Sequence, residues 1–156
     1  MKLLLFLLSF LFGFSVVAQE VQIGSVENKI VIGDLAGNRN FAFGVKNVLE
    51  EVVQDGGYDL NPNSTTIINV ELLFFDVKKT SVQIGIYGKN TDTYMLAAQA
   101  YIIKDGKKKK PVKATGEAKS ISTATLIIDE GGKFSQANVS TAIKKLCEDL
   151  IDKLKL

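Results

Sequence analysis

Six lysines fall within ten residues in the stretch KDGKKKKPVK, which spans residues 104 to 113. Amino groups at this density could attract the phosphate groups of lipid headgroups, since each lysine near an anionic surface contributes about 1 kcal/mol. The alternative is a solvated hairpin end whose lysines protect a sheet edge against pairing. No aromatic residue interrupts the run, unlike the stacking platforms of single-strand binders. The candidate contact residues for an anionic surface are Lys104, Lys107, Lys108, Lys109 and Lys110.

Other chemistry-bearing patterns are weak. The chain contains no histidine, which excludes catalytic triads with a histidine base and leaves zinc only carboxylates and one thiol. The carboxylates are scattered, and the glycines match neither a dinucleotide fingerprint nor a phosphate loop. We therefore expect no enzyme activity, no metal and no cofactor. A small enzyme with an unrecognised carboxylate or lysine site is the less favoured alternative.

Cys147 is the only cysteine, so no disulfide can form within the chain. It shares a predicted helical face with Ile143, Leu146 and Leu150, which indicates a buried thiol that packs as a small apolar group. A reactive thiol or an intermolecular disulfide is the alternative.

The amino-terminal residues have the pattern of a secretory signal peptide. Lys2 precedes an apolar run at residues 3 to 17, and Val16 and Ala18 occupy the positions that cleavage requires. The run is shorter than the roughly 20 apolar residues of a membrane-spanning helix. We expect cleavage of residues 1–18, an exported protein in the periplasm or outside the cell, and no spanning segment after cleavage. Cleavage removes one of the 19 basic residues and none of the 17 acidic ones, so the net charge falls to about +1 and gives no reason to expect nucleic acid.

Residues 19–156 have the length of one domain, and two of its segments have the apolar spacing of amphipathic helices. Asn38 or Asn40 could cap the first helix, and Gly56 or Gly57 could end it. Ser135 could cap the second. The apolar stripes consist of Phe41, Val45, Val48, Leu49 and Val52 in the first helix, and of Val139, Ile143, Leu146, Cys147, Leu150 and Leu154 in the second.

The other segments predict strands. After a polar lead-in at 19–28, a short strand is expected at 29–35. A strand with alternating apolar residues then starts near Thr66 and becomes apolar on both sides at Leu73 and Phe75.

A tight connection at Lys78, Lys79 and Thr80 is expected to lead into the next strand, SVQIGIYG. Residues 94–103 fit a strand or a buried helix, and the strong turn beside them favours a strand. Asp105 and Gly106 should form a two-residue hairpin turn that sets Lys104 opposite Lys107. Residues 123–133 fit a short strand or a loop.

These elements predict an α+β domain: an antiparallel meander sheet of about four to five strands, with two amphipathic helices packed on one face.

The stretches NVLEEVVQDGGYDLNPNSTTIINVELLFFDV and FSQANVSTAIKKLCEDLIDKL resemble the YajG-like family of small bacterial envelope lipoproteins, in which a helix ends in a Gly-Tyr pair, here Gly57 and Tyr58. The resemblance covers residues 29 to 155. It implies helices packed on an antiparallel sheet in a periplasmic setting, with no catalytic residues. Family members carry a lipidated cysteine after the signal, whereas this chain has Gln19, which puts membrane anchoring in doubt.

The sequence thus predicts an exported envelope accessory or binding protein without catalytic activity, whose partner is an envelope protein or an anionic lipid surface. A self-assembling structural subunit is the alternative, and the sequence does not determine the oligomeric state. The expected working surfaces are the lysine hairpin and residues 80–90, where Gln83, Gly85 and Tyr87 leave the outer face uncharged. Binding could also involve pairing of a sheet edge with a partner.

Overall fold

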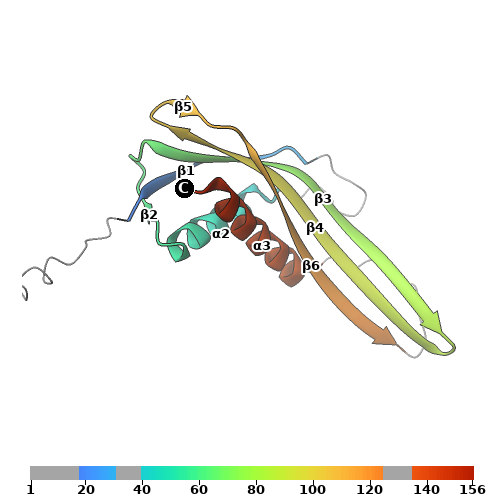
Figure 1. Cartoon of the computed structure of the whole chain (residues 1–156). Helices are drawn as coiled ribbons and strands as arrows, with labels where there is room; N and C mark the ends of the chain where they lie inside the picture. Colours follow the sequence, from blue (N-terminus) through green and yellow to red (C-terminus); the bar gives the residue numbers. More distant parts are fainter. Residues whose placement is uncertain (1–17, 31–39, 125–134) are drawn as a thin grey trace, which may run out of the picture.

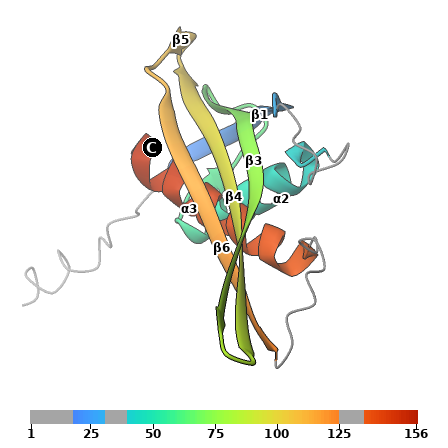
Figure 2. The ribbon, with the colours of Figure 1, turned by 90° about the vertical axis from the view of Figure 1, so that its right-hand side faces the viewer.

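The computed structural model describes residues 18–30, 40–124 and 135–156. They form a sheet with two helices packed on one of its faces, so the predicted α+β class is confirmed (Figure 1 and Figure 2). The predicted signal peptide lies almost entirely outside the described residues, as do most of the predicted strand at 29–35 and of the ambiguous segment at 123–133. The elements are β1 (Glu20–Asn28), α2 (Ala42–Asp55), β2 (Asp59–Leu60), β3 (Thr66–Ile84), β4 (Tyr87–Lys104), β5 (Lys107–Lys108), β6 (Val112–Ala124) and α3 (Gln136–Leu154).

The sheet is mixed rather than wholly antiparallel. Its strand order is β2-β1-β3-β4-β5, and β6 pairs with β4 beyond the short β5 ladder. The meander of β3, β4 and β6 is antiparallel, as predicted. β1 instead runs parallel to β3, because α2 lies between them in the chain and carries it back to the end of the sheet where β1 starts.

The prediction of a polar lead-in at residues 19–28 is wrong, since this segment forms β1. Only Val21 and Ile23 of this strand are buried, so the segment alone carries little apolar signal. The strand is stabilised mainly by its backbone pairing with β3. Asn69 of β3 fills an irregularity in β1, where its Oδ1 accepts hydrogen bonds from the backbone N–H of Ser25 at 2.8 Å and from the Ser25 hydroxyl at 3.0 Å.

The predicted connection at Lys78–Thr80 is also wrong. Lys78 pairs with Thr93 and Thr80 with Thr91 inside one continuous ladder, and β3 is a single strand of 19 residues. The chain turns at Gly85 and Ile86, where Gly85 has φ of +61°; a glycine in this conformation at the first loop position is typical of a type II′ hairpin turn. The alternation is weak around the lysines because, among the described residues of this part of the sheet, no large apolar side chain is buried.

A bulge at Leu73 explains why the sequence is apolar on both sides there. Leu72 pairs with Ala98 and Phe74 with Ala97, so β3 has one extra residue at this point. The extra residue reverses which β3 residues face the helices. The buried apolar residues are Ile68, Val70 and Leu72 before the bulge, and Phe75 and Val77 after it.

The helix ends follow the predicted signals only in part. Ser135 caps α3 as predicted, by accepting a hydrogen bond from the backbone N–H of Asn138. The N-cap of α2 is Phe41, without a side-chain cap, and the predicted Asn40 instead accepts a hydrogen bond from the backbone N–H of Ala42 at 2.9 Å at the start of the helix. Gly57, with φ of +82°, ends α2. Both helices place their apolar stripes in one core with the sheet. The predicted stripe residues are buried, except that Val48 is only partly buried.

Candidate functional site

The predicted lysine hairpin forms at one end of the sheet. Asp105 and Gly106 both have positive φ, 50° and 74°, as a type I′ turn requires, and Lys104 pairs with Lys107. Lys104 and Lys107 to Lys110 are all exposed. Lys108 lies over the ring of Tyr101, with its Nζ 3.5 Å from the ring centroid. The structure therefore groups the predicted residues on a solvated turn, and their contact with an anionic surface stays a prediction.

At the opposite end of the sheet, β3, β4 and β6 extend beyond the two helices as a long projection (Figure 1). The last buried row across the three strands consists of Val77, Tyr94 and Ala118. We call the part beyond this row, residues 78–93 and 119–124, the arm. Six residue steps separate Lys78 from Ile84, so the arm is about 20 Å long at the usual rise of a strand.

The apolar face of the sheet changes side where the arm begins. Directly opposed residues share a face and successive residues alternate. Val77 faces the helices, so the row of Thr80, Thr91 and Ile121 faces away from them. Val82, Ile84 and Tyr87 lie on this same outer face. The helix-side face of the arm carries Lys79, Ser81, Gln83, Gly88, Asn90, Asp92, Ser120, Ser122 and Ala124.

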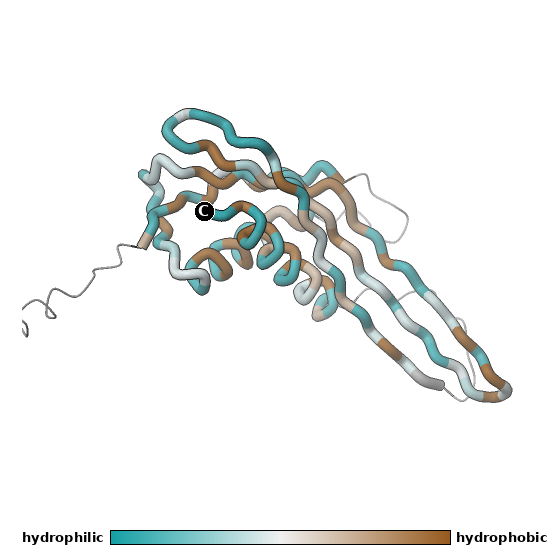
Figure 3. Tube along the Cα trace, viewed as in Figure 1, coloured by the Kyte–Doolittle hydropathy of each residue, from teal (hydrophilic) through white to brown (hydrophobic). Residues whose placement is uncertain are grey.

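Hydrophobic residues are found at the end of the arm (Figure 3). We call Val82, Ile84, Ile86 and Tyr87 the tip; their exposed fractions are 54%, 78%, 64% and 68%. Ile121 on β6 is 59% exposed and extends the same outer face. Contiguous exposed apolar groups of this kind mark interaction sites.

The tip lies within the predicted surface at residues 80–90. The prediction of an uncharged outer face is wrong, because Gln83 lies on the helix side, whereas Lys89 shares the outer face with Tyr87. The separate strand predicted for this surface is the end of β3 and the start of β4.

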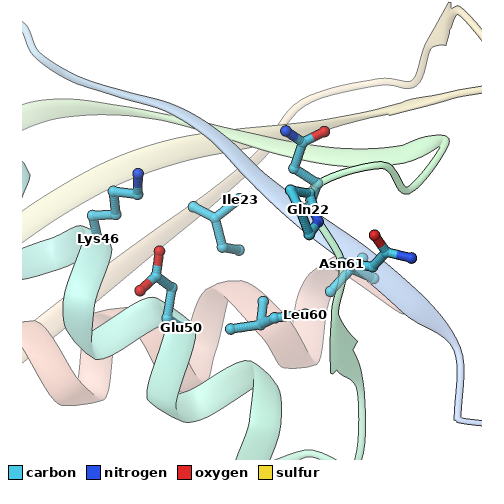
Figure 4. Close-up of a pocket in the computed structure, with 8 residues that line it drawn as sticks. Gln22, Ile23, Lys46, Glu50, Leu60 and Asn61 are labelled. Carbon is cyan, nitrogen blue, oxygen red and sulfur yellow. The ribbon is translucent and has the colours of Figure 1, made fainter.

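A concave site of about 280 Å³ lies between β1, α2 and the segment after β2 (Figure 4). Lys46 and Glu50 extend from α2 beside Ile23 and Leu60, and Asn61 closes the far side. Its lining offers one amine, from Lys46, and one carboxylate, from Glu50, among apolar and amide side chains. A second cavity of about 640 Å³ lies near the amino-terminal ends of both helices and is lined by Asn40, Phe41, Gly44, Gln136, Val139, Ser140 and Ile143.

Cys147 is buried, which confirms the interpretation of its thiol as a small apolar group. Burial, and to a smaller extent the neighbouring Glu148 carboxylate, raises the pKa of the thiol to about 12. In the described parts of the chain, no three His, Cys, Asp or Glu side chains gather closely enough to hold a metal ion. No helix among residues 18–30, 40–124 and 135–156 is long and apolar enough to cross a membrane.

No protein-family model matches the sequence, and no curated protein matches it. Among solved structures, the minor lipoprotein from Acinetobacter baumannii has a TM-score of 0.47 at 11% identity, covering 88% of this chain and 91% of that one. Lipoprotein GNA1162 from Neisseria meningitidis scores 0.45 at 10% identity, covering 65% and 84%. Rare lipoprotein B from Shewanella oneidensis scores 0.41 at 9% identity, covering 86% and 93%. At these scores the likeness carries no conclusion about function, and membership of the YajG-like family stays a prediction.

Proposed function

We propose that the protein is an exported, non-catalytic accessory protein of the bacterial envelope, which attaches to another envelope component through the tip of the arm. The observation that carries the proposal is the apolar tip at the end of the three-stranded arm, which projects beyond the core. Val82, Ile84 and Tyr87 contribute nothing to the core, yet they are large and apolar. Such residues on a projecting element are typical of a surface that is covered in the working state.

The predicted signal peptide supports the export part of the proposal. The absence of histidine from the sequence, together with the small polar set in the concave site beside α2, supports a role in binding rather than catalysis. The lysine hairpin is a second candidate surface. It lies at the far end of the sheet from the tip (Figure 1), so the two surfaces can be tested separately.

The test is co-sedimentation of the purified protein, expressed from the full chain, with a bacterial envelope fraction. We expect the wild-type protein to sediment with the envelope and the double variant Ile84→Ser/Ile86→Ser to stay in the supernatant. The matched control is Phe43→Ser, which removes a side chain that is 75% exposed on α2, outside the arm. Lys107→Glu/Lys109→Glu tests the hairpin.

Two outcomes would count against the proposal. Sedimentation that survives loss of both isoleucines but disappears in the hairpin variant would move the binding surface to the lysines. Failure of the wild-type protein to sediment, with elution as a large assembly in size-exclusion chromatography, would favour a self-assembling subunit instead.

A further inference from the structure

We infer that the component bound by the tip is the surface of an anionic lipid bilayer, into which Ile84, Ile86 and Tyr87 insert at the boundary between headgroups and acyl chains. This inference rests on the proposed function, because it names the partner of the same site. It differs from the predicted contact of the lysine hairpin, since it uses the opposite end of the sheet and combines apolar insertion with charge.

The shape of the tip suits insertion. Ile84 and Tyr87 are the last paired residues of β3 and β4, and Gly85 and Ile86 close the turn between them. Four large side chains therefore extend from a narrow convex end. Interfacial apolar groups enter a bilayer by about 5–10 Å, which is the length of two or three residues of a strand. Tyrosine is enriched at this level of the membrane because its ring is apolar and its hydroxyl remains hydrated.

The backbone pairing sets how deep the tip can go. β4 is paired with β3 on one side and with β6 on the other as far as Gly88. No described strand pairs with β3 beyond Leu72, and unpaired peptide groups cannot enter the hydrocarbon core without a large cost. The tip therefore adsorbs at the interface and does not span the membrane.

The charges on the outer face of the arm complement an anionic surface. Lys89 pairs with Val82 on this face, and Lys78 and Lys119 flank Thr93 farther back. Lys119 is already paired with Glu117, since its Nζ lies 2.9 Å from a carboxylate oxygen of that residue, so we assign the attraction to an anionic surface to Lys89. Among the described residues, the outer face of the arm carries no acidic side chain; Asp92 points to the helix side. Lys89 is two residues from Tyr87, about 7 Å along the strand. When the tip is inserted, the amino group of Lys89 reaches the level of the lipid phosphates.

The size of the tip favours lipid over a second copy of the chain. A stable protein interface uses roughly 20–30 residues on each side. The exposed large apolar residues of the arm are the four tip residues and Ile121, and Met95 and Phe74, which are 38% and 45% exposed, lie behind the arm. A small convex apolar set beside lysines is too small for a standard dimer interface. It is sufficient for reversible membrane binding, in which apolar insertion and electrostatic attraction add.

The sequence contains no tryptophan, so Tyr87→Trp creates a single fluorescent reporter at the tip. The purified variant is titrated with vesicles of phosphatidylethanolamine and phosphatidylglycerol, with and without brominated acyl chains. We expect the emission of Tyr87→Trp to shift to shorter wavelength and to be quenched by bromine. Phe43→Trp, a reporter at an equally exposed site on α2, should show neither effect.

Two further variants in the Tyr87→Trp background separate the apolar part from the charged part. Ile84→Ser/Ile86→Ser should lower the partition coefficient at least about tenfold, since both side chains lose apolar burial. Lys89→Gln should lower it about fivefold on anionic vesicles and leave binding to neutral phosphatidylcholine vesicles unchanged. Circular dichroism checks that each variant keeps the sheet.

An unchanged Tyr87→Trp emission at millimolar lipid would overturn the inference. Binding to vesicles without that shift would do the same and would assign lipid contact to another surface. These results are distinguishable from failure of the proposed function. If the tip variants still abolish sedimentation with the envelope fraction while protein-free vesicles do not bind, the tip binds an envelope protein and only the lipid inference fails.

Discussion

Gly116 of β6 lies directly against the backbone of Ala142 in α3. A Cβ atom at Gly116 would overlap the carbonyl group of Ala142 and approach the backbone nitrogen of Leu146. These are backbone atoms, which cannot rotate away as a flexible side chain could. The contact fixes the distance between α3 and the sheet at the centre of the core.

Gly116→Ala should therefore destabilise the protein strongly. Overpacking of a core costs about 1–3 kcal/mol, and the rigid helix backbone puts the expected loss at about 3 kcal/mol or more. Urea unfolding measures the change. Gly44→Ala is the matched control, because a Cβ there meets only Ile143 Cδ1, at 3.7 Å. That control should stabilise α2 by up to about 1 kcal/mol, and equal effects of the two substitutions would contradict the packing argument.

Deletion of Leu73 should remove the bulge and leave the inward-facing residues of β3 in place. Leu72 pairs with Ala98 and Phe74 with Ala97, so joining Leu72 to Phe74 makes the alternation regular and keeps Phe75 and Val77 on the helix side. The variant loses only the partly buried Leu73 side chain, so we expect urea unfolding to remain cooperative. The control Leu73→Val keeps the residue count and the bulge. Loss of the cooperative transition in the deletion variant alone would show that the fold requires the bulge itself.

Cys147 should resist thiol reagents in the native state. Its pKa is raised from 9.0 to about 12 by burial, so the reactive thiolate is scarce at pH 8 and the reagent has no access. Labelling should follow global unfolding as denaturant is added. The raised pKa also has a consequence for stability. The unfolded chain releases the thiol proton from about pH 9, so this contribution to stability is present below pH 9 and is lost as pH rises toward 12.

Cys147→Ala is the control for that alkaline loss. It should flatten the part of the stability profile between pH 9 and 12 that the thiol causes, at the cost of a small cavity. Rapid labelling of the wild-type protein in buffer without denaturant would contradict the buried position of the thiol.

Protonation of Glu71 should contribute to the loss of stability at acidic pH. The pKa of its carboxyl group is lowered, first by the hydrogen bond from Lys29 Nζ at 2.6 Å and then by the hydrogen bond from Gln99. A lowered native pKa gives stability that is present above the ordinary value of 4.5 and is lost as pH falls through the native value. Glu71→Gln should be less stable than wild type at pH 7, and the difference should shrink below pH 4.5. A difference that stays constant with pH would mean that the ion pair contributes nothing.

The sequence alone determined the features that local chemistry controls. Each helix has a complete apolar stripe and recognisable end signals, such as Ser135 and Gly57, and these formed as predicted. Asp105 and Gly106 specify their turn because both central positions need positive φ. The burial of Cys147 followed from its place on the stripe.

Only the tertiary structure decided the features that depend on what covers a residue. β1 was missed because its pairing with β3 stabilises it more than its own two buried apolar residues do. The sequence predicts a turn at residues 78–80 because no large apolar residue of the described arm is buried, so the alternation of apolar and polar residues there is weak. The apolar face changes side at the arm. This change can be recognised only from the register of the three strands and from the length over which the helices cover them. Both are long-range relationships, and they determine which side of the strand pair Ile84 and Tyr87 occupy.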